Sequence, residues 1–576
     1  MSIFSAFNVG RLALAAQQTA LQVTGQNIAN ANNDAYTRQR VLFQTMPPMD
    51  LGYAQLGTGV RVADIQRVID EAVAARINSA NSSLCSTQAQ QELLSQLEGI
   101  FNELSGSGAN LSTAMSRFFD SLESLSTNPD DSSVRQQLLA NADSLSDSFN
   151  NLAGQMNAAR ASINDSVKIT VDDINQIIQN IAQLNRQIVA SEAGGADLGK
   201  ANDLRDQRDA LLTKLSGLID VDATEASDGS LNILVGSDFL VFGNNAYTLT
   251  TSDQMDRGVK VSTVEFEQNG AELALRGGKL EGLVAARDQI LPQFIDDIST
   301  LAGTMINQIN MLHNEGQGLD RLSSATSEEE VSGPMNVLNA AGLHFTPVNG
   351  SFNIDVYNRL TGEKKTVNIT VDLDGIGADA TLQSLVAEIN SKLSAAFGGS
   401  SPVSAEATIT NNLVVQSGND NYTFAFSDDT SGLLAALGMN NFFSGYDALS
   451  MKVSETLHDN PDLIAASLTG APGDNSNALR MANLRNATVL DNGTATLADF
   501  YQGVVGSLAV QSASAKDRLD NQSLLLTSAQ DERQQVSGVN IDEETINLIS
   551  YQRAYQAAAK FISVIDSLLE TLITAL

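Results

Sequence analysis

The chain has 576 residues, enough for several domains that each bury a core. Its 67 acidic and 33 basic residues give a net charge of −34. This balance argues against nucleic acid and against an anionic membrane surface as partners, because both bind through a basic face. A single cysteine, Cys85, excludes an intramolecular disulfide, and the absence of an 18-residue apolar run predicts no membrane insertion.

The first thirty residues predict a helix with one large apolar side chain in each heptad. These side chains are Phe7, Leu14, Leu21 and Ile28. The residues three positions further along are small or polar: Gly10, Gln17 and Thr24. Such a helix is marginal by itself in water, so the pattern indicates that it packs against a partner helix.

An asparagine cluster follows this helix and predicts its end. The cluster comprises Asn27, Asn30, Asn32 and Asn33, and Tyr36 stands just beyond it. Asparagine competes for backbone hydrogen bonds and tolerates left-handed conformations, so it ends helices and builds turns. Two interpretations remain open: a plain helix end followed by a loop, and a turn that contacts a neighbouring subunit.

The middle of the chain is mainly helical. Helical periodicity dominates from about residue 84 to 219, and returns at 290–312 and 497–530, with Gly, Ser and Asn-Pro breaks between helices. Two stretches, about 221–280 and 335–450, alternate apolar and polar residues and contain Asn-Gly turns, which predicts strands. We therefore expect an elongated antiparallel helical bundle that carries β-rich inserts.

The C-terminal segment holds a heptad pattern to its last residue. The first apolar position of each heptad is Ile541, Leu548, Tyr555, Ile562, Leu569 and Leu576. The second is Glu544, Tyr551, Ala558, Ile565 and Leu572, with Glu544 the only charged exception. This pattern predicts a coiled-coil seam, which we pair with the N-terminal helix. The alternative is two unrelated helices of one globular core.

These patterns predict a multidomain, mainly α fold with paired terminal coiled-coil helices, a discontinuous helical bundle and inserted β-rich or α+β outer domains. The expected divisions are a terminal assembly domain (1–45 with 535–576), a helical rod domain (46–220, 283–330 and 452–534), a β-rich insert (221–282) and an α+β outer domain (331–451).

Two terminal motifs resemble those of the flagellar axial proteins, the family of rod, hook and hook–filament junction subunits. "ALQVTGQNIANANNDAYTRQR" is similar to the family's N-terminal signature through Asn27-Ile28-Ala29-Asn30 and Tyr36, although Asp34-Ala35 replaces the commoner Pro-Gly. "SGVNIDEETINLISYQRAYQAAAKFISVIDSLLETLI" resembles the paired C-terminal end. "YTRQR" and "GVNIDEE" together favour the hook-proximal junction member.

The resemblance implies a structural component at the junction of hook and filament that is required for filament assembly. It implies a self-assembled ring or tube, contacts with the hook protein and a second junction protein, and a cytoplasmic export chaperone on the C-terminal helix. It also implies an extracellular location on the flagellum, reached without a cleaved signal peptide. The expected assembly interface is Phe7, Leu14, Leu21, Asn27, Ile28, Asn30, Tyr36, Ile541, Leu548, Tyr551, Tyr555, Ile562, Ile565, Leu569, Leu572 and Leu576.

Motifs for catalysis, metals or cofactors are missing from the sequence. His313, His344 and His458 lie far apart and form no zinc-binding spacing. "VDLDG" at 371–375 resembles part of a calcium loop, yet it lacks the later ligands, so we interpret it as a turn. Cys85 has no nearby histidine or basic cluster in sequence. We expect no enzyme activity and no cofactor.

Three other functions remain open at this point. A flagellar hook or distal rod subunit is the alternative within the same structural class. An extracellular binding module such as an adhesin would use the β-rich inserts, but the paired heptad ends disfavour it as the main role. An enzyme carried on the flagellum, for example a peptidase in the 335–450 insert, is disfavoured by the missing motifs.

Overall fold

The computed structural model describes residues 3–33, 35–50, 55–103, 110–193 and 200–575. The chain divides into two compact units. Unit 1 comprises Met1–Leu93, Ala161–Gln289 and Ser512–Leu576, and unit 2 comprises Leu94–Arg160 and Ile290–Gln511. Three long helices contribute residues to both units: α2 (Glu71–Glu103), α4 (Ser132–Glu192) and α12 (Leu497–Ser537).

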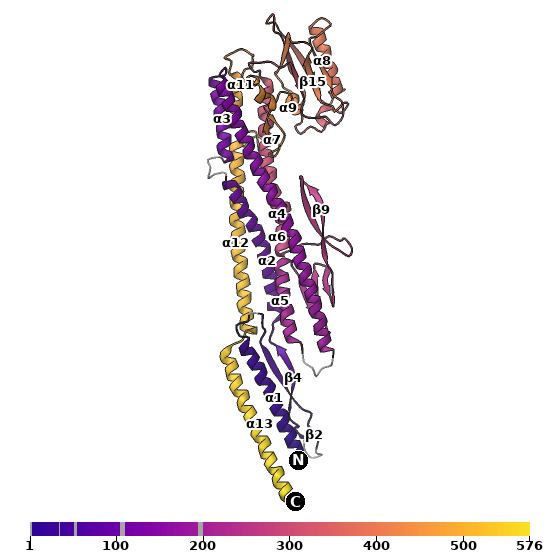
Figure 1. Ribbon diagram of the computed structural model, residues 1–576, viewed down its shortest axis with the longest axis vertical. Helices are drawn as coiled ribbons and strands as arrows, with labels where there is room; N and C mark the ends of the chain where they lie inside the picture. Colours follow the sequence, from indigo (N-terminus) through magenta and orange to yellow (C-terminus); the bar gives the residue numbers. More distant parts are fainter. Residues whose placement is uncertain (1–2, 34, 51–54, 104–109, 194–199, 576) are drawn as a thin grey trace. The chain divides into compact units, whose positions relative to one another are not determined.

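Unit 1 contains the two chain ends as an antiparallel helix pair. Helix α1 (Ile3–Ala29) lies beside α13 (Ile541–Ala575), with the start of α1 against the end of α13 (Figure 1). Strands β1 (Gln39–Thr45) and β4 (Val60–Arg67) form an antiparallel ribbon after α1, and β2 (Met49–Asp50) pairs with β3 (Gln55–Leu56). Ala20, Val23 and Val41 form a small apolar core here, with Tyr551 packed against it.

The rest of unit 1 combines helices with two small sheets. The remaining helical elements are α5 (Asn202–Leu218), α6 (Gly278–Ala285) and a π-turn, η1 (Ala286–Ile290). A four-stranded antiparallel sheet runs in the order β5 (Asp222–Glu225), β6 (Leu231–Val235), β7 (Asp238–Phe242) and β8 (Asn245–Ala246). Strands β9 (Leu249–Asp256) and β10 (Val259–Phe266) form a hairpin. Ile174, Ile181 and Ile188 of α4 are buried, as their helical spacing predicts.

Unit 2 joins helices to a compact α+β part. Its main helices are α3 (Leu111–Thr127), α7 (Leu291–Glu315), α8 (Leu382–Ala396) and α11 (Ser476–Asn483), with the short α9 (Leu433–Leu437) and α10 (Glu455–Asp459). The three-residue helices are η2 (Leu338–Ala340), η3 (Pro461–Leu463) and η4 (Leu484–Asn486).

The strands of unit 2 form two three-stranded sheets and one short pair. One sheet has the order β13 (Lys364–Val371), β12 (Gly350–Asn358), β16 (Tyr422–Ser427), and the other has the order β11 (Ser324–Thr326), β15 (Leu413–Ser417), β14 (Val403–Ala407). The pair is β17 (Phe443–Ser444) with β18 (Lys452–Val453). The core gathers aromatic rings, with the Phe118 centroid 5.8 Å from that of Phe442 and 5.5 Å from that of Phe443.

The mainly α architecture with β-rich insertions is confirmed, and unit 2 also contains helix α8, which begins after Thr381. The Thr381 hydroxyl accepts a hydrogen bond from the Ser384 backbone N–H at 3.1 Å. The structure differs between residues 46 and 67, which we assigned to the helical rod and which contain strands, because "VRVADIQR" alternates as a strand should. The four-domain division itself stays a prediction.

Candidate assembly site at the paired chain ends

The face that α1 turns toward its neighbours is lined by small side chains. Ala16, Ala20 and Thr24 are buried, together with Gly10. A Cβ atom on Gly10 would lie only 2.8 Å from Cγ1 of Ile562, so glycine allows α13 to approach closely. The four large residues predicted for the interface are all half-buried: Phe7, Leu14, Leu21 and Ile28. The closest packing of α1 therefore involves its small residues.

The predicted seam of α13 is only partly covered by the same chain. Ile565 is buried at 4% exposure, whereas Ile541 is 52% exposed. The half-buried seam residues are Leu548, Tyr551, Tyr555, Ile562 and Leu569. The side chain of Leu572 and the whole of Leu576 lie outside the described residues.

A second apolar stripe on α13 is exposed. Its members are Ile546, Ile549, Phe561, Val564 and Leu568, and Ile573 is also exposed although helical geometry places it about 140° from Leu568. Leu568 is 56% exposed and Ile573 is 70% exposed, values that are high for large aliphatic side chains. The terminal pair thus leaves much apolar surface in contact with water in a single chain.

Asn27 ties the end of α1 to the first strand. Its side-chain Oδ1 accepts a hydrogen bond from the Gln39 backbone N–H at 3.0 Å, and its Nδ2 donates to the Gln39 carbonyl at 2.9 Å. The Tyr36 hydroxyl also donates to Oδ1 at 2.8 Å. Asn27 is only 1% exposed, and these contacts satisfy a side chain that would be costly to bury unpaired.

The same asparagine reaches across to α13. Its Nδ2 donates to Oε2 of Glu544 at 3.1 Å. Arg38 pairs with the other carboxylate oxygen, with Nε 2.9 Å from Oε1, and its Nη1 lies 3.0 Å from Oε2 of the exposed neighbour Glu543. Glu544 is therefore a carboxylate at 2% exposure that is held by donors from two places in the N-terminal segment.

The remaining predicted polar residues form the turn after α1. The Asn30 side chain donates to the Gln26 carbonyl at 3.0 Å, and the Asn33 N–H donates to the Asn30 carbonyl at 2.9 Å. Burial raises the pKa of the Tyr36 hydroxyl, and the negative charge of Asp206 raises it further. Tyr36 therefore remains a protonated donor toward Asn27, as the hydrogen-bond geometry requires.

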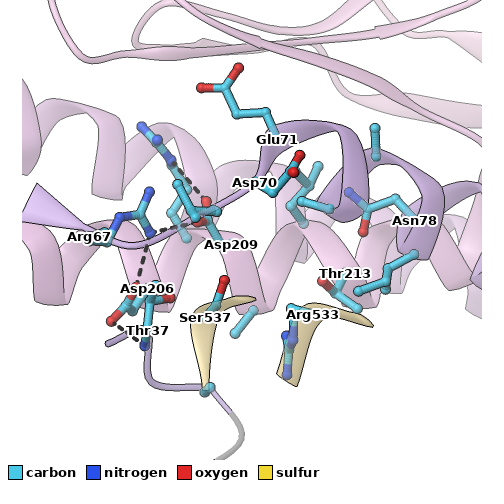
Figure 2. A pocket seen from close by; sticks show the side chains of 18 of the residues that line it. Thr37, Arg67, Asp70, Glu71, Asn78, Asp206, Asp209, Thr213, Arg533 and Ser537 are labelled. Atoms are coloured by element: carbon cyan, nitrogen blue, oxygen red, sulfur yellow. Dashed lines mark hydrogen bonds and ion pairs between the residues drawn. The ribbon is translucent and has the colours of Figure 1, made fainter. Parts of the chain in front are cut away.

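Helix α5 also contacts this turn and the β1–β4 ribbon. Figure 2 shows Arg67 between two carboxylates, with its Nη1 2.9 Å from Oδ1 of Asp206 and 2.6 Å from Oδ2 of Asp209. Asp206 also accepts the Thr37 N–H at 3.2 Å. These groups line a cleft of about 730 Å³ whose wall also includes Arg533 and Ser537 near the end of α12. The motif "NDLRDQRD" thus positions the N-terminal turn.

Asn27 is one example of a contact that recurs in both units. In unit 1, Asn175 of α4 exchanges both backbone hydrogen bonds with Leu249, each at 2.8 Å, where β9 begins. In unit 2, Asn390 of α8 does the same with Ala405 of β14, at 2.7 and 2.9 Å. A helical asparagine thereby substitutes for a neighbouring strand. Sequence reasoning missed these residues, because a helical Asn facing inward was the only signal.

The residues that the sequence analysis weighed as catalytic or metal-binding candidates have structural roles. Burial lowers the pKa of His313 to about 4, and its two ring nitrogens are paired with the Asn440 carbonyl and the Ala465 N–H, so the imidazole is neutral. Burial raises the pKa of the Cys85 thiol, which keeps it protonated. Asp374 and Asp379 accept backbone N–H groups of Ile376 and Gly375, as residues of a turn do.

Comparisons with known proteins agree with the terminal motifs. A family model of the helical domain of flagellar hook-associated protein FlgK matches residues 94–325. A model of the C-terminal region of the flagellar basal body rod FlgEFG proteins matches residues 530–575. Both matched models describe structural proteins of the bacterial flagellum.

Within that class, the chain is similar to flagellar hook-associated protein 1 over its whole length. It is 27% identical to that protein from Bacillus subtilis (strain 168), covering 100% of this chain and 99% of the relative. The protein from Escherichia coli (strain K12) is 26% identical, with 99% of both chains covered. The resemblance inferred from the terminal motifs is thereby confirmed.

A solved structure shares the fold. The flagellar hook junction protein FlgK from Burkholderia pseudomallei matches with a TM-score of 0.50 at 18% identity, covering 80% of this chain and 100% of that chain. Among the described residues, no helix combines the length and the hydropathy needed to cross a membrane.

Proposed function

We propose that this chain is a structural axial subunit of the bacterial flagellum that forms the junction between hook and filament. The observation that carries this proposal is the match to hook-associated protein 1 over 100% of the chain. The terminal helix pair supports it physically, because a soluble subunit that exposes apolar stripes on both sides of one helix gains by covering them with neighbours.

Self-association through the chain ends is the mechanism. Copies pack side by side through α1 and α13 into a ring or tube, and the partly covered seam from Leu548 to Leu569 is buried further in that contact. Burying a single large aliphatic side chain contributes about 1.5–3 kcal/mol, so a few such residues from each copy suffice for a stable interface. The hook protein on one side and a second junction protein on the other are the partners of this assembly.

Export precedes assembly. The subunit reaches its extracellular position on the flagellum through the flagellar export channel. A cytoplasmic chaperone shields the exposed stripe of α13 until then, since an apolar helix face of this size promotes aggregation. A pull-down with residues 497–576 as bait should recover that chaperone, and recovery only by the N-terminal half of the chain would contradict this assignment.

The role is mechanical, and the chain acts without enzymatic chemistry or a cofactor. The three histidines support this view, because His313 is a buried structural group, while His344 and His458 are paired with single carboxylates at exposed positions. No feature favours the adhesin or peptidase alternatives over the axial one.

Electron microscopy of a deletion strain tests the proposed position. Intact hooks that lack filaments are expected, since the filament would have no junction on which to grow. Missing hooks would instead assign the chain to the rod or the hook, and normal filaments would contradict an axial role altogether. Complementation with the intact chain should restore filaments and swimming.

A further inference from the structure

A buried acid interrupts an otherwise apolar helix seam in unit 1. Glu544 occupies a heptad position that is apolar or small in every following repeat, from Tyr551 to Leu572. Its side chain is 3% exposed and faces donors from Asn27 and Arg38. A buried charge is costly to desolvate, and replacing a buried ion pair by apolar residues is often neutral or stabilising. Glu544 is therefore a poor choice if stability alone were required.

The surrounding surfaces allow α13 to slide along α1. The seam of α13 repeats every seven residues, and the buried residues of α1 include the small Gly10, Ala16, Ala20 and Thr24. A shift of one helical turn, about 5.4 Å, would exchange the two seam positions of each heptad and so keep mostly apolar side chains in contact. Apolar packing alone therefore distinguishes poorly between neighbouring registers.

The contact between Asn27 and Glu544, in contrast, distinguishes the observed register from its neighbours. In the observed register Asn27 faces Glu544, and Gly10 lies against Ile562. A one-turn shift in one direction would place Leu548 opposite Asn27 and separate Glu544 from its donors. The opposite shift would place Glu544 beside the buried Val23, where the carboxylate would lose its compensation.

We propose that Glu544, through its contacts with Asn27 and Arg38, is the positioning residue that fixes the register of α13 against α1. The register determines which faces of the two helices remain exposed, and hence the surface that each copy presents to the next. That consequence for assembly rests on the proposed function, whereas the register itself does not. The device resembles a buried polar residue that specifies the pairing of a coiled coil at some cost in stability.

Disulfide trapping on the purified full-length chain tests the register directly. In a Cys85→Ser background, Gly10→Cys is combined with Ile562→Cys to report the observed register. Ala558→Cys and Asp566→Cys, each paired with Gly10→Cys, report shifts of one turn in either direction. With Glu544 present, the 10–562 cross-link should exceed both others by about tenfold, a preference of roughly 1.4 kcal/mol.

The Glu544→Leu variant should retain its helical content but lose this preference, so that the three cross-links form within about twofold of one another. This substitution leaves neither donor without a partner, because Asn27 still donates to the Gln39 carbonyl and Arg38 still pairs with Glu543. The matched control is Glu543→Leu, which removes the neighbouring acid at 58% side-chain exposure and should keep the tenfold preference. A preserved preference in Glu544→Leu would overturn the proposal. Loss of all three cross-links would overturn it too, because Glu544 would then be needed for pairing rather than for register.

Discussion

The interior of unit 2 and the terminal helix pair of unit 1 contain similar apolar side chains, which are buried in unit 2 and largely exposed or half-buried on α13. Helix α7 buries Phe294, Ile298 and Met305 completely, inside one chain. Helix α13 has more aliphatic residues than α7, yet Ile565 is the only one of its large apolar side chains, among those described, that is buried. Apolar periodicity thus identifies a helix face but leaves open whether the same chain or another copy covers it.

The density of partners around each face explains the difference. In unit 2, α7 is enclosed by α9, α11 and strands β16 and β17, so its buried face is wider than one seam. In the terminal pair, α1 is the main partner of α13 among the described elements, and Tyr551 also touches the small core beside β1. One partner helix covers one stripe, and the second stripe of α13 stays in water. The first region is complete as a folded unit, and the second is completed by assembly, as proposed above.

The largest expected effect comes from removing a ring at the centre of unit 2. Phe118 is fully buried between Phe119, Phe442 and Phe443. We expect Phe118→Ala to lower the free energy of unfolding of unit 2 by about 3–5 kcal/mol through the cavity it leaves. Urea unfolding followed by circular dichroism measures this. Met335→Ala, at a 73% exposed position, is the control and should change stability little. A loss below ~1 kcal/mol for Phe118→Ala would show that this core is not a packed one.

The second prediction concerns the pH dependence of the stability of unit 2. The pKa of His313 is lowered to about 4 from an ordinary 6.5, first by burial and also by the positive charge of Arg135. The unfolded chain therefore binds a proton at a higher pH than the folded chain does. The contribution of the neutral His313 to the stability of unit 2 should fall as pH decreases from about 6.5 to about 4, by on the order of 3 kcal/mol, and level off below.

His313→Gln removes that titration while keeping a polar side chain. The difference in unfolding free energy between the intact chain and His313→Gln should shrink as the pH falls through this window. Urea titrations monitored by amide exchange in α7 peptides at several pH values give this difference. A constant difference from pH 7 to 4 would mean that the proton on His313 plays no part in acid unfolding.

The third prediction places a charge in the seam of the terminal pair. Ile565→Asp removes about 1.5–3 kcal/mol of burial and puts a carboxylate against α1. We expect faster amide exchange in α13 of the monomer, and loss of filaments and swimming, while unit 2 unfolds as before. Ser563→Asp, on an exposed side of the same helix, is the control for helix propensity. Equal exchange rates in the two variants would mean that the seam is not packed in the monomer.

The sequence predicts the structure where it contains a repeated apolar pattern. It does not predict the contacts that depend on a single polar side chain and a distant partner. The helical periodicities of α4 and α7 and the pairing of the chain ends follow from spacing. Glu544 was visible only as an exception to the heptad, because its donors lie more than 500 residues away in sequence. Likewise, Asn175 and Asn390 look like ordinary helix residues until the strands they bind are in place.

The smallest expected effect separates two glycines of α1. A Cβ atom on Gly25 would meet nothing within 4 Å, so Gly25→Ala should stabilise the helix by about 0.5–1 kcal/mol through backbone entropy. The same change at Gly10 offers the same entropy but places a methyl group 2.8 Å from Ile562 Cγ1 and 3.1 Å from Phe561 Cδ1. Because these are side-chain atoms they can shift, yet the shift displaces α13 and should cancel the gain. Amide exchange of α13 in the dilute monomer should therefore slow or stay level for Gly25→Ala and accelerate for Gly10→Ala. Equal slowing in both variants would show that α13 does not rest against Gly10 and that the terminal pair is open in the single chain.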